Sequence, residues 1–227
     1  LGNNDLRADL SIYLYRRSAN QQYALNINGG GNKTRYYFSA GYDKNQMNLT
    51  RNYYERITLN ANNTYLLLKD KLELTAGVAF AQSTTANNNN PIIKDAQPYT
   101  RLADENGNPA VVQADYRQGY KNTAGNGKLL NWDYVPLEEL ALSDNQTKLT
   151  DYRVNLGIEY KLDFLLRGLK LIGRYQFGRG VSDQEDYRNE NMYFTRHLIN
   201  NYSQMSPGGT VTRPIPPGGI LDQYAYD

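Results

Sequence analysis

The chain has no cysteine, and it has only one histidine and one tryptophan among 227 residues. Without cysteine it can form neither a disulfide framework nor a thiolate metal site. A transition-metal site would have to be built from His197 and carboxylates alone, and His197 would also be the only histidine available for a Ser-His-Asp triad. Both arrangements are improbable, so we interpret His197 as an ordinary surface or loop histidine. We therefore expect no catalytic residue, no cofactor, no metal and no enzymatic activity.

The sequence also lacks a strong net charge, a long apolar run and a recognisable secretory signal. A formal net charge of +2 gives no broad electrostatic basis for binding nucleic acid. No apolar run approaches the roughly 20 residues that a membrane-spanning helix needs. No secretory signal peptide is recognisable at Leu1. The residue pattern is already under way at this point, so we expect a fragment or a mature internal segment.

Tyrosine is abundant instead, with 21 residues against 5 phenylalanines. Its apolar ring ends in a hydroxyl, which suits a boundary between apolar and aqueous regions. Asparagine and glycine are also frequent, and both favour turns and extended loops. This composition indicates β structure at a boundary between apolar and aqueous regions.

Apolar and polar residues alternate in six segments, which is the pattern of β-strands with two different faces. Val154 and Leu156, for example, alternate with Arg153 and Asn155. Each segment is about 10 residues long, the length that a tilted strand needs to cross a bilayer. The predicted antiparallel strands cover residues 20–30, 33–43, 53–64, 71–82, 150–162 and 168–178.

The alternation predicts an apolar face toward lipid and a polar face toward the interior of a barrel. Residues assigned to the lipid face include Ile57, Leu74, Val78, Leu156, Ile158 and Leu171. Residues assigned to the interior include Arg35, Arg56, Glu73, Arg153, Glu159, Lys161 and Arg174. A shift of one residue in strand pairing would exchange the two sets.

Short and long connections alternate along the predicted strands, as in outer-membrane barrels. Residues 83–149 and 179–227 are expected to be largely extracellular loop. The first of these carries enough apolar residues, Ile92 and Ile93 among them, to be ordered, whereas the polar run 87–90 is expected to be mobile. Aromatic residues near both ends of the apolar faces resemble two aromatic girdles. A soluble antiparallel sandwich would also alternate, but it would not readily accept so long a connection between neighbouring strands.

Several stretches resemble one protein family in their order and spacing. Residues 26–42 (NINGGGNKTRYYFSAGY) are similar to a hairpin of the SusC/RagA family, although Asn28 replaces a serine and Gly31 an asparagine of its pattern. Further similar stretches are 54–62 (YERITLNAN), 104–109 (DENGNP), 132–140 (WDYVPLEEL), 151–156 (DYRVNL), 198–201 (LINN) and 215–219 (IPPGG). Together they cover most of the chain.

The resemblance implies an all-β transmembrane barrel of about 22 strands in the bacterial outer membrane of Bacteroidetes. Such TonB-dependent transporters import oligosaccharides, glycans or peptides, with a SusD-like lipoprotein lid outside and the TonB complex inside. Residues 1–227 would supply about six strands of that barrel, and the plug domain would lie outside this chain. We expect the interior charges to pair with one another and with the plug rather than to bind substrate.

The candidates for substrate contact are aromatic residues of the long loop, because aromatic rings can stack on sugars or pack on peptides. They are Tyr99, Tyr116, Tyr120, Trp132 and Tyr134. Packing of the loop against itself or against a lid protein explains them equally well. The oxygen-rich stretch that begins at Asp104 lacks the glycine and glutamate of a calcium-binding EF-hand loop, so we predict an ordinary turn there.

Two other functions fit parts of the sequence. A soluble β-rich carbohydrate-binding module would use tyrosines as a sugar platform, and an adhesin or structural barrel would span the membrane without transport. Dependence on detergent would distinguish a transporter from the soluble module. Plug and TonB-box sequences would distinguish a transporter from the adhesin or structural barrel.

Overall fold

The computed structural model describes residues 5–88, 97–215 and 219. Ile92, Ile93, the end of the polar run 87–90 and most of the stretch 215–219 therefore lie outside the described residues. The chain divides into two compact units. We call Arg17–Asn87 with Asn145–Asp186 the sheet unit, and Leu1–Arg16 with Asn88–Asp144 and Tyr187–Asp227 the loop unit.

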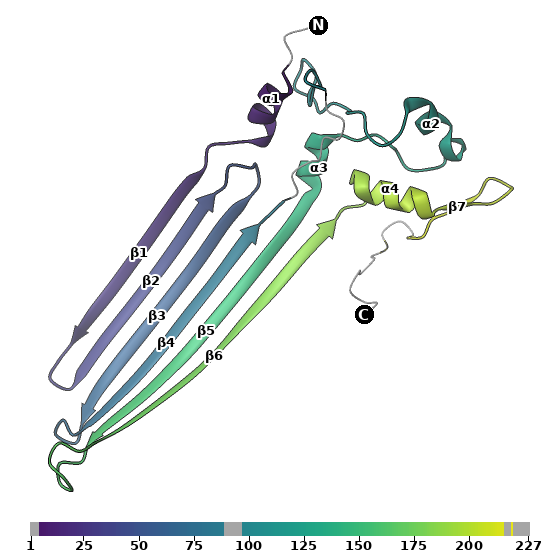
Figure 1. Cartoon of the computed structure of the whole chain (residues 1–227). Helices are drawn as coiled ribbons and strands as arrows, with labels where there is room; N and C mark the ends of the chain where they lie inside the picture. Colours follow the sequence, from purple (N-terminus) through teal and green to yellow (C-terminus); the bar gives the residue numbers. More distant parts are fainter. Residues whose placement is uncertain (1–4, 89–96, 216–218, 220–227) are drawn as a thin grey trace. The chain divides into compact units, whose positions relative to one another are not determined.

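The sheet unit is formed by six antiparallel strands in sequential order, and Figure 1 shows them side by side. The strands are β1 (Ala19–Gly30), β2 (Thr34–Gln46), β3 (Tyr53–Leu67), β4 (Leu72–Ala86), β5 (Ser143–Lys161) and β6 (Lys170–Arg188). All six predicted strands are present, so the all-β antiparallel class is confirmed. The described strands form an open sheet whose edges are β1 and β6.

Three strands extend into the two segments predicted to be loop, and β2 and β3 each end three residues later than predicted. Strand β4 continues to Ala86, β5 begins at Ser143 rather than at residue 150, and β6 continues to Arg188 rather than to residue 178. The prediction of loop for 83–149 and 179–227 is therefore wrong at these ends. The reason is physical: the backbone ladder continues after the apolar residues stop, so hydrophobic alternation no longer marks the strand.

The strand pairing confirms the two predicted faces, because residues directly opposite in a ladder share one face. Leu74 lies opposite Ile158, and Val78 lies opposite Val154. Glu73 lies opposite Glu159 on the other face. On the apolar side the ring centroids of Tyr152 and Phe177 are 6.1 Å apart, so β6 has the same alternation.

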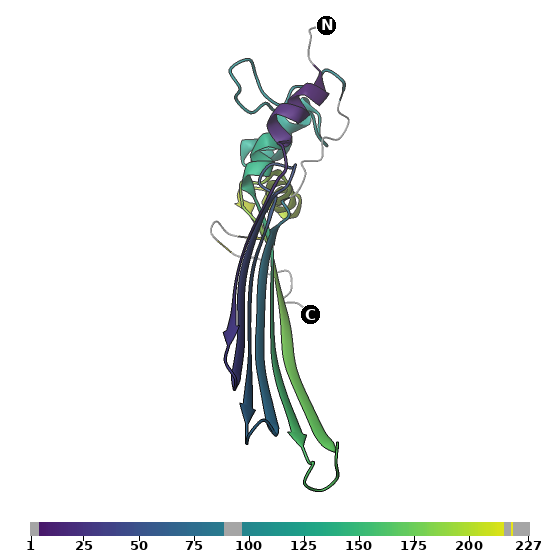
Figure 2. The ribbon, with the colours of Figure 1, turned by 90° about the vertical axis from the view of Figure 1, so that its left-hand side faces the viewer.

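The sheet unit is a single layer, as the nearly edge-on view in Figure 2 shows. Its large apolar side chains are consequently exposed: Leu25 by 61%, Val78 by 51% and Leu171 by 59%. The described buried apolar residues belong to the loop unit, apart from Ala86. A soluble domain would cover such a face, so the sheet unit has no soluble core of its own.

The short connections are ordered turns. The β1–β2 turn closes with a hydrogen bond from the Gly31 N–H to the Thr34 carbonyl at 2.8 Å. The β5–β6 turn begins with the Leu162 N–H bonded to the Leu169 carbonyl, also at 2.8 Å. Between β3 and β4 the chain turns through three successive left-handed residues, from Leu68 to Asp70. These turns confirm the three predicted hairpins.

The loop unit contains short helices and a small hairpin. Its elements are α1 (Leu6–Asp9), η1 (Leu10–Leu14), α2 (Gln118–Thr123), η2 (Ala124–Gly127), α3 (Pro136–Leu142), α4 (Tyr193–Tyr202), β7 (Gln204–Met205) and β8 (Val211–Thr212). Its core includes Leu14 and Leu102, both with no exposed surface, and Trp132, Leu140 and Ile199. Among the residues that the structure describes, no helix is both long enough and apolar enough to cross a membrane.

Candidate functional site

An aromatic cluster in the loop unit brings together three of the predicted residues. Tyr116 stacks on Tyr120 with ring centroids 5.0 Å apart and an interplanar angle of 25°. Trp132 meets Tyr116 edge-on at 4.9 Å and Tyr120 at 5.8 Å. The three rings thus form one cluster, in which Trp132 is only 6% exposed and Tyr120 is 49% exposed.

His197 from α4 completes this cluster. Its ring stacks on Tyr116 at 5.4 Å and meets Trp132 edge-on at 6.0 Å. Its Nε2 is hydrogen bonded to the Tyr116 hydroxyl at 2.9 Å, and its Nδ1 is 3.0 Å from Asn201 Nδ2. His197 was predicted to be an ordinary loop histidine, and in the structure its Nε2 ties α4 to Tyr116 in the segment before α2, while its Nδ1 contact to Asn201 stays within α4.

Helix α4 also binds the backbone of residues 130–133. The Arg196 guanidinium donates to the carbonyls of Asn131 at 2.8 Å and Asp133 at 2.9 Å. Asn200, which is 6% exposed, exchanges two hydrogen bonds with the backbone of Leu130. Charge-assisted and buried hydrogen bonds of this kind are among the stronger polar contacts in proteins. They hold two segments that are about sixty residues apart in the sequence as one unit.

A half-buried carboxylate of α3 lies at the first residue of α4. Glu139 accepts a hydrogen bond from the Tyr193 backbone N–H. Burial raises the pKa of Glu139, although the bond from Tyr193 and the charge of Arg196 act in the opposite direction. Burial, and then the charge of Glu139, raise the pKa of Tyr134, so this phenol stays protonated at neutral pH.

Tyr134 and Tyr193 form a second aromatic pair, with centroids 5.0 Å apart. Tyr193 also lies 5.7 Å from His197, and its hydroxyl donates to Asp115 Oδ2 at 3.0 Å. Burial and this bond to Asp115 raise the pKa of Tyr193. Tyr193 was missed in the sequence because nothing local distinguishes it from the other tyrosines. Only its position on the same helix face as His197, four residues on, could have suggested it.

The predicted site residues therefore fall into three groups. Trp132 and Tyr134 are buried and serve mainly to build the loop unit. Tyr116 and Tyr120 retain accessible surface at the edge of the cluster. Tyr99 is 56% exposed and makes no ring contact among the described residues.

The stretch at Asp104 is the tight turn that the sequence predicts. Asp104 Oδ1 accepts the backbone N–H groups of Asn106 and Asn108, each at 2.8 Å, and Oδ2 accepts the Asn108 side chain at 2.9 Å. The side-chain bond from Asn108 makes the largest contribution to lowering the pKa of Asp104. Its oxygens are thus used within the turn. No cluster of three or more metal-ligating side chains occurs in the described part of the chain.

The polar face of the sheet combines charges with flat amide side chains. Glu159 pairs with Lys170 at 2.7 Å, which agrees with the expected pairing among interior charges. Asn62 lies across Gly77, where a Cβ atom would be 2.3 Å from the Asn62 side-chain oxygen. A larger residue at this position would therefore displace the Asn62 amide from its place across the neighbouring strand.

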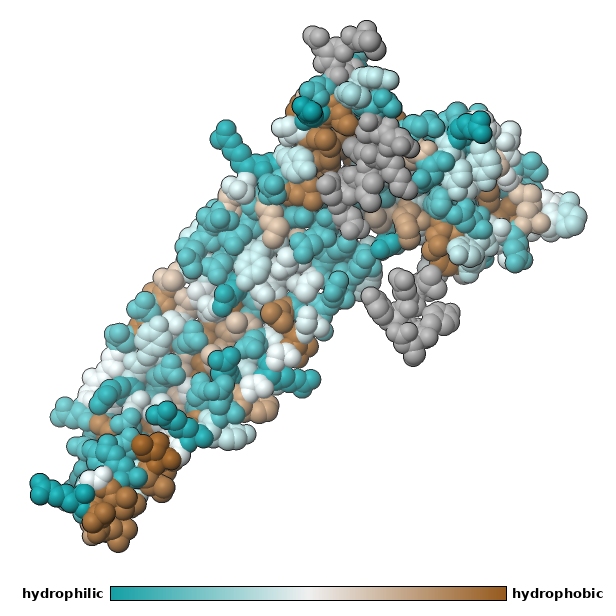
Figure 3. Space-filling model, viewed as in Figure 1, coloured by the Kyte–Doolittle hydropathy of each residue, from teal (hydrophilic) through white to brown (hydrophobic). Residues whose placement is uncertain are grey.

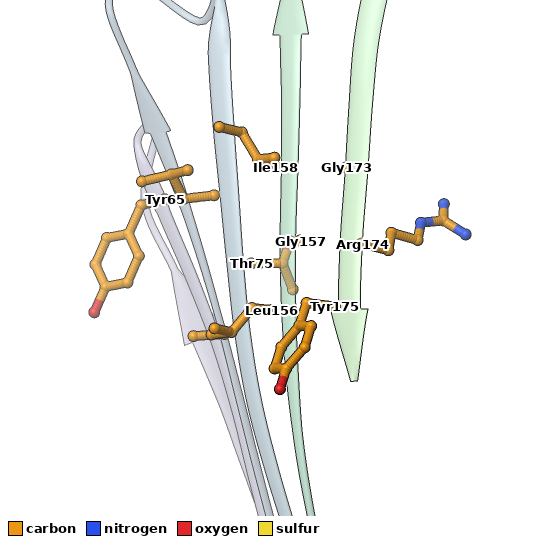
Figure 4. Close-up of a pocket in the computed structure, with 10 residues that line it drawn as sticks. Tyr65, Thr75, Leu156, Gly157, Ile158, Gly173, Arg174 and Tyr175 are labelled. Carbon is orange, nitrogen blue, oxygen red and sulfur yellow. The ribbon is translucent and has the colours of Figure 1, made fainter. Parts of the chain in front are cut away.

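A shallow hollow lies on the sheet between β3 and β6. Leu74, Ala76, Leu156 and Ile158 contribute to its lining, which is apolar and carries no cluster of reactive groups. Figure 4 shows Arg174 pointing away from Leu156 and Ile158, to the opposite side of the sheet. The hollow arises where small residues interrupt the large apolar ones.

The architecture is that of an antiparallel β-barrel segment with ordered connecting loops. The chain is similar in structure to a chain described as "Structure of the RagAB peptide importer in the 'closed-closed' state", with a TM-score of 0.56 and 18% sequence identity. The match covers 84% of this chain and 21% of that chain, so this chain spans about a fifth of the length of the protein that it matches. No family model and no curated protein sequence matches the chain.

Proposed function

We propose that this chain is part of a TonB-dependent outer-membrane transporter of the SusC/RagA type, which imports an oligosaccharide or an oligopeptide. The observation that carries the proposal is the uncovered apolar face of a single-layer sheet. In water such a face is unfavourable by about 25 cal/mol for each Å² that could be buried, whereas in a bilayer it is solvated by lipid. The likeness to the RagAB peptide importer supports the same architecture.

The height of the apolar band supports a position in a bilayer. On β3, most lipid-face residues from Ile57 to Leu67 are apolar or aromatic, over ten residue steps of about 3.4 Å, or about 34 Å along the strand. A strand tilted by about 40° would cross about 26 Å, close to the roughly 25 Å of outer-membrane barrels. Two residues before Ile57, on the same face, Glu55 pairs with Lys44 at 3.6 Å, as expected just outside the apolar band.

The remaining parts of such a transporter would lie outside residues 1–227. Unpaired strand edges are not tolerated in lipid, so β1 and β6 would each pair with a further strand of the barrel. We place the loop unit outside the cell, where Tyr99, Tyr116 and Tyr120 would contact substrate or a SusD-like lipoprotein. The protein would act by binding, gating and release, without covalent chemistry.

The test uses the full-length protein in its own membrane. We expect it to be extracted only by detergent and to take up oligosaccharide or peptide only when TonB is present. Deletion of residues 95–140 should abolish uptake or lipoprotein binding while the barrel still assembles. Solubility without detergent would favour a carbohydrate-binding module, and membrane insertion without TonB-dependent uptake would favour an adhesin or structural barrel.

A further inference from the structure

Two neighbouring turns of the sheet unit expose large apolar side chains. In the β3–β4 turn Leu68 is 61% exposed, and in the β5–β6 turn Phe164, Leu165 and Leu166 are 63%, 68% and 66% exposed. Figure 3 shows apolar residues gathered at this tip of the sheet. The turns are adjacent because the Lys161 N–H bonds to the Lys71 carbonyl at 2.8 Å. Contiguous exposed apolar residues usually mark a binding surface.

The β5–β6 turn folds toward the lipid face of the sheet. The ring of Phe164 is 6.4 Å from that of Tyr160. Tyr160 lies opposite Leu72, in the last apolar row before the turns. The exposed apolar residues therefore continue the apolar face rather than the charged one.

This turn holds its apolar side chains in a fixed position. The N–H groups of Leu165 and Leu166 bond to the Leu162 carbonyl at 2.8 Å and 3.2 Å. Asp163 Oδ1 accepts the Gly168 N–H at 2.9 Å. The turn is thus ordered by its own backbone, although its apolar side chains contact little else.

Basic side chains surround the apolar tip. Lys69, Lys71 and Arg167 are exposed, and none of the three is in an ion pair within the described part of the chain. Exposed apolar residues flanked by unpaired cations are complementary to an anionic lipid surface, because the apolar groups enter the acyl boundary and the cations meet phosphates. The β1–β2 turn has Lys33 but no large apolar residue, so it lacks this combination.

We propose that the β3–β4 and β5–β6 turns form an interfacial anchor that binds anionic phospholipid headgroups. The proposal rests on the proposed function, which places the sheet in a bilayer with its short turns at the inner leaflet. The anchor fixes the depth of this side of the barrel. Lys69, Lys71 and Arg167 bind the phosphates, while Phe164, Leu165 and Leu166 lie among the first acyl carbons.

The experiment uses the full-length protein in bilayers and a Phe164→Trp substitution as a fluorescent reporter. The difference in quenching between this variant and its parent is measured with brominated phosphatidylglycerol or brominated phosphatidylcholine at equal mole fraction. We expect phosphatidylglycerol to be enriched about fivefold at the reporter, the effect of about one basic residue near an anionic surface. Adding Lys69→Gln, Lys71→Gln and Arg167→Gln should remove the enrichment, and Lys33→Gln should leave it unchanged.

Three outcomes overturn the proposal. Equal quenching by both lipids would show apolar contact without headgroup recognition. Absence of quenching in a protein that has inserted would show that the turns meet water or a protein partner. Loss of the enrichment in the Lys33→Gln control would show a non-specific charge effect. A protein that does not enter the bilayer at all would instead contradict the proposed function, which distinguishes the two failures.

Discussion

Asn200 pairs with Leu130 as if it were a residue of a neighbouring strand. The Leu130 N–H donates to Asn200 Oδ1 at 2.8 Å, and Asn200 Nδ2 donates to the Leu130 carbonyl at 3.0 Å. A side-chain amide can do this because it carries a donor and an acceptor side by side. The pair joins α4 to the connection between β4 and β5, so the order of the aromatic cluster depends on it.

Replacing Asn200 with alanine should destabilise the loop unit. Two polar groups of Leu130 would lose their partners, and we expect the free energy of unfolding to fall by about 2–4 kcal/mol. Hydrogen–deuterium exchange would detect this as faster exchange at residues 128–135. Asn201→Ala is the matched control, because Asn201 is exposed and its side-chain contact, to His197, stays within α4, so exchange at residues 128–135 should change little. Equal effects of the two substitutions would contradict the role assigned to Asn200.

Substitutions in the aromatic cluster should separate binding from folding. Trp132→Ala creates a cavity in the core of the loop unit and should destabilise it by about 3–5 kcal/mol. Tyr120→Ala removes a ring that is half exposed, so it should weaken substrate or lipoprotein binding with little loss of stability. Titration of the full-length protein with its substrate, alongside thermal unfolding, would measure both. If Tyr120→Ala binds substrate and lipoprotein as the parent does, Tyr120 is not a contact residue.

Glu139 should make stability depend on pH. Burial raises its pKa above the ordinary value of 4.5, so the folded protein holds this proton more tightly than the unfolded chain. The resulting stabilisation is fully present below about pH 4.5 and is lost as pH rises through the raised pKa. Glu139→Gln keeps a carbonyl oxygen for the Tyr193 N–H and removes the titration. The difference in Tm between about pH 4.5 and pH 7.5 should therefore shrink most in this variant and less in Glu138→Gln, because the charge of Glu138 makes only a smaller contribution to the raised pKa of Glu139.

Two adjacent residues of β3 should tolerate arginine to different degrees. Ala61 lies opposite Val78 on the lipid face, whereas Asn62 lies opposite Gly77 on the polar face. We expect Ala61→Arg to cost about 2–4 kcal/mol when the full-length barrel folds into vesicles, because the charge would lie in the apolar band. Asn62→Arg should cost less. A larger cost for Asn62→Arg would mean that the faces are reversed with respect to lipid.

The strands and their faces could be predicted from local pattern, because alternation with period two is imposed by the backbone of a single strand. The same rule explains why β5 and β6 were predicted too short. Beyond Thr150 in β5 and Phe177 in β6 the lipid-face positions become mostly polar, with Lys148 and Arg179 among them. The strand continues through backbone hydrogen bonds, which have no signature in hydropathy.

The site was predicted only in part, because its assembly depends on contacts between distant segments. Aromatic composition identified Tyr116, Tyr120 and Trp132 as candidates, and the structure brings them together. It did not identify Tyr193, nor did it predict that His197 would join them, since both belong to a helix about sixty to eighty residues further along the chain.

The sequence by itself thus determined the sheet: six antiparallel strands, their order, their two faces and their tight turns. These follow from side-chain alternation and turn residues within short windows, where each strand meets its sequence neighbour. Tertiary structure decided which loop residues are buried, because burial of Trp132 and Tyr134 requires α4 to pack against the β4–β5 connection. It also decided that Phe164 lies on the apolar side of the sheet, beside Tyr160. Contacts between segments far apart in the chain are selected by packing as a whole, and no local pattern specifies them.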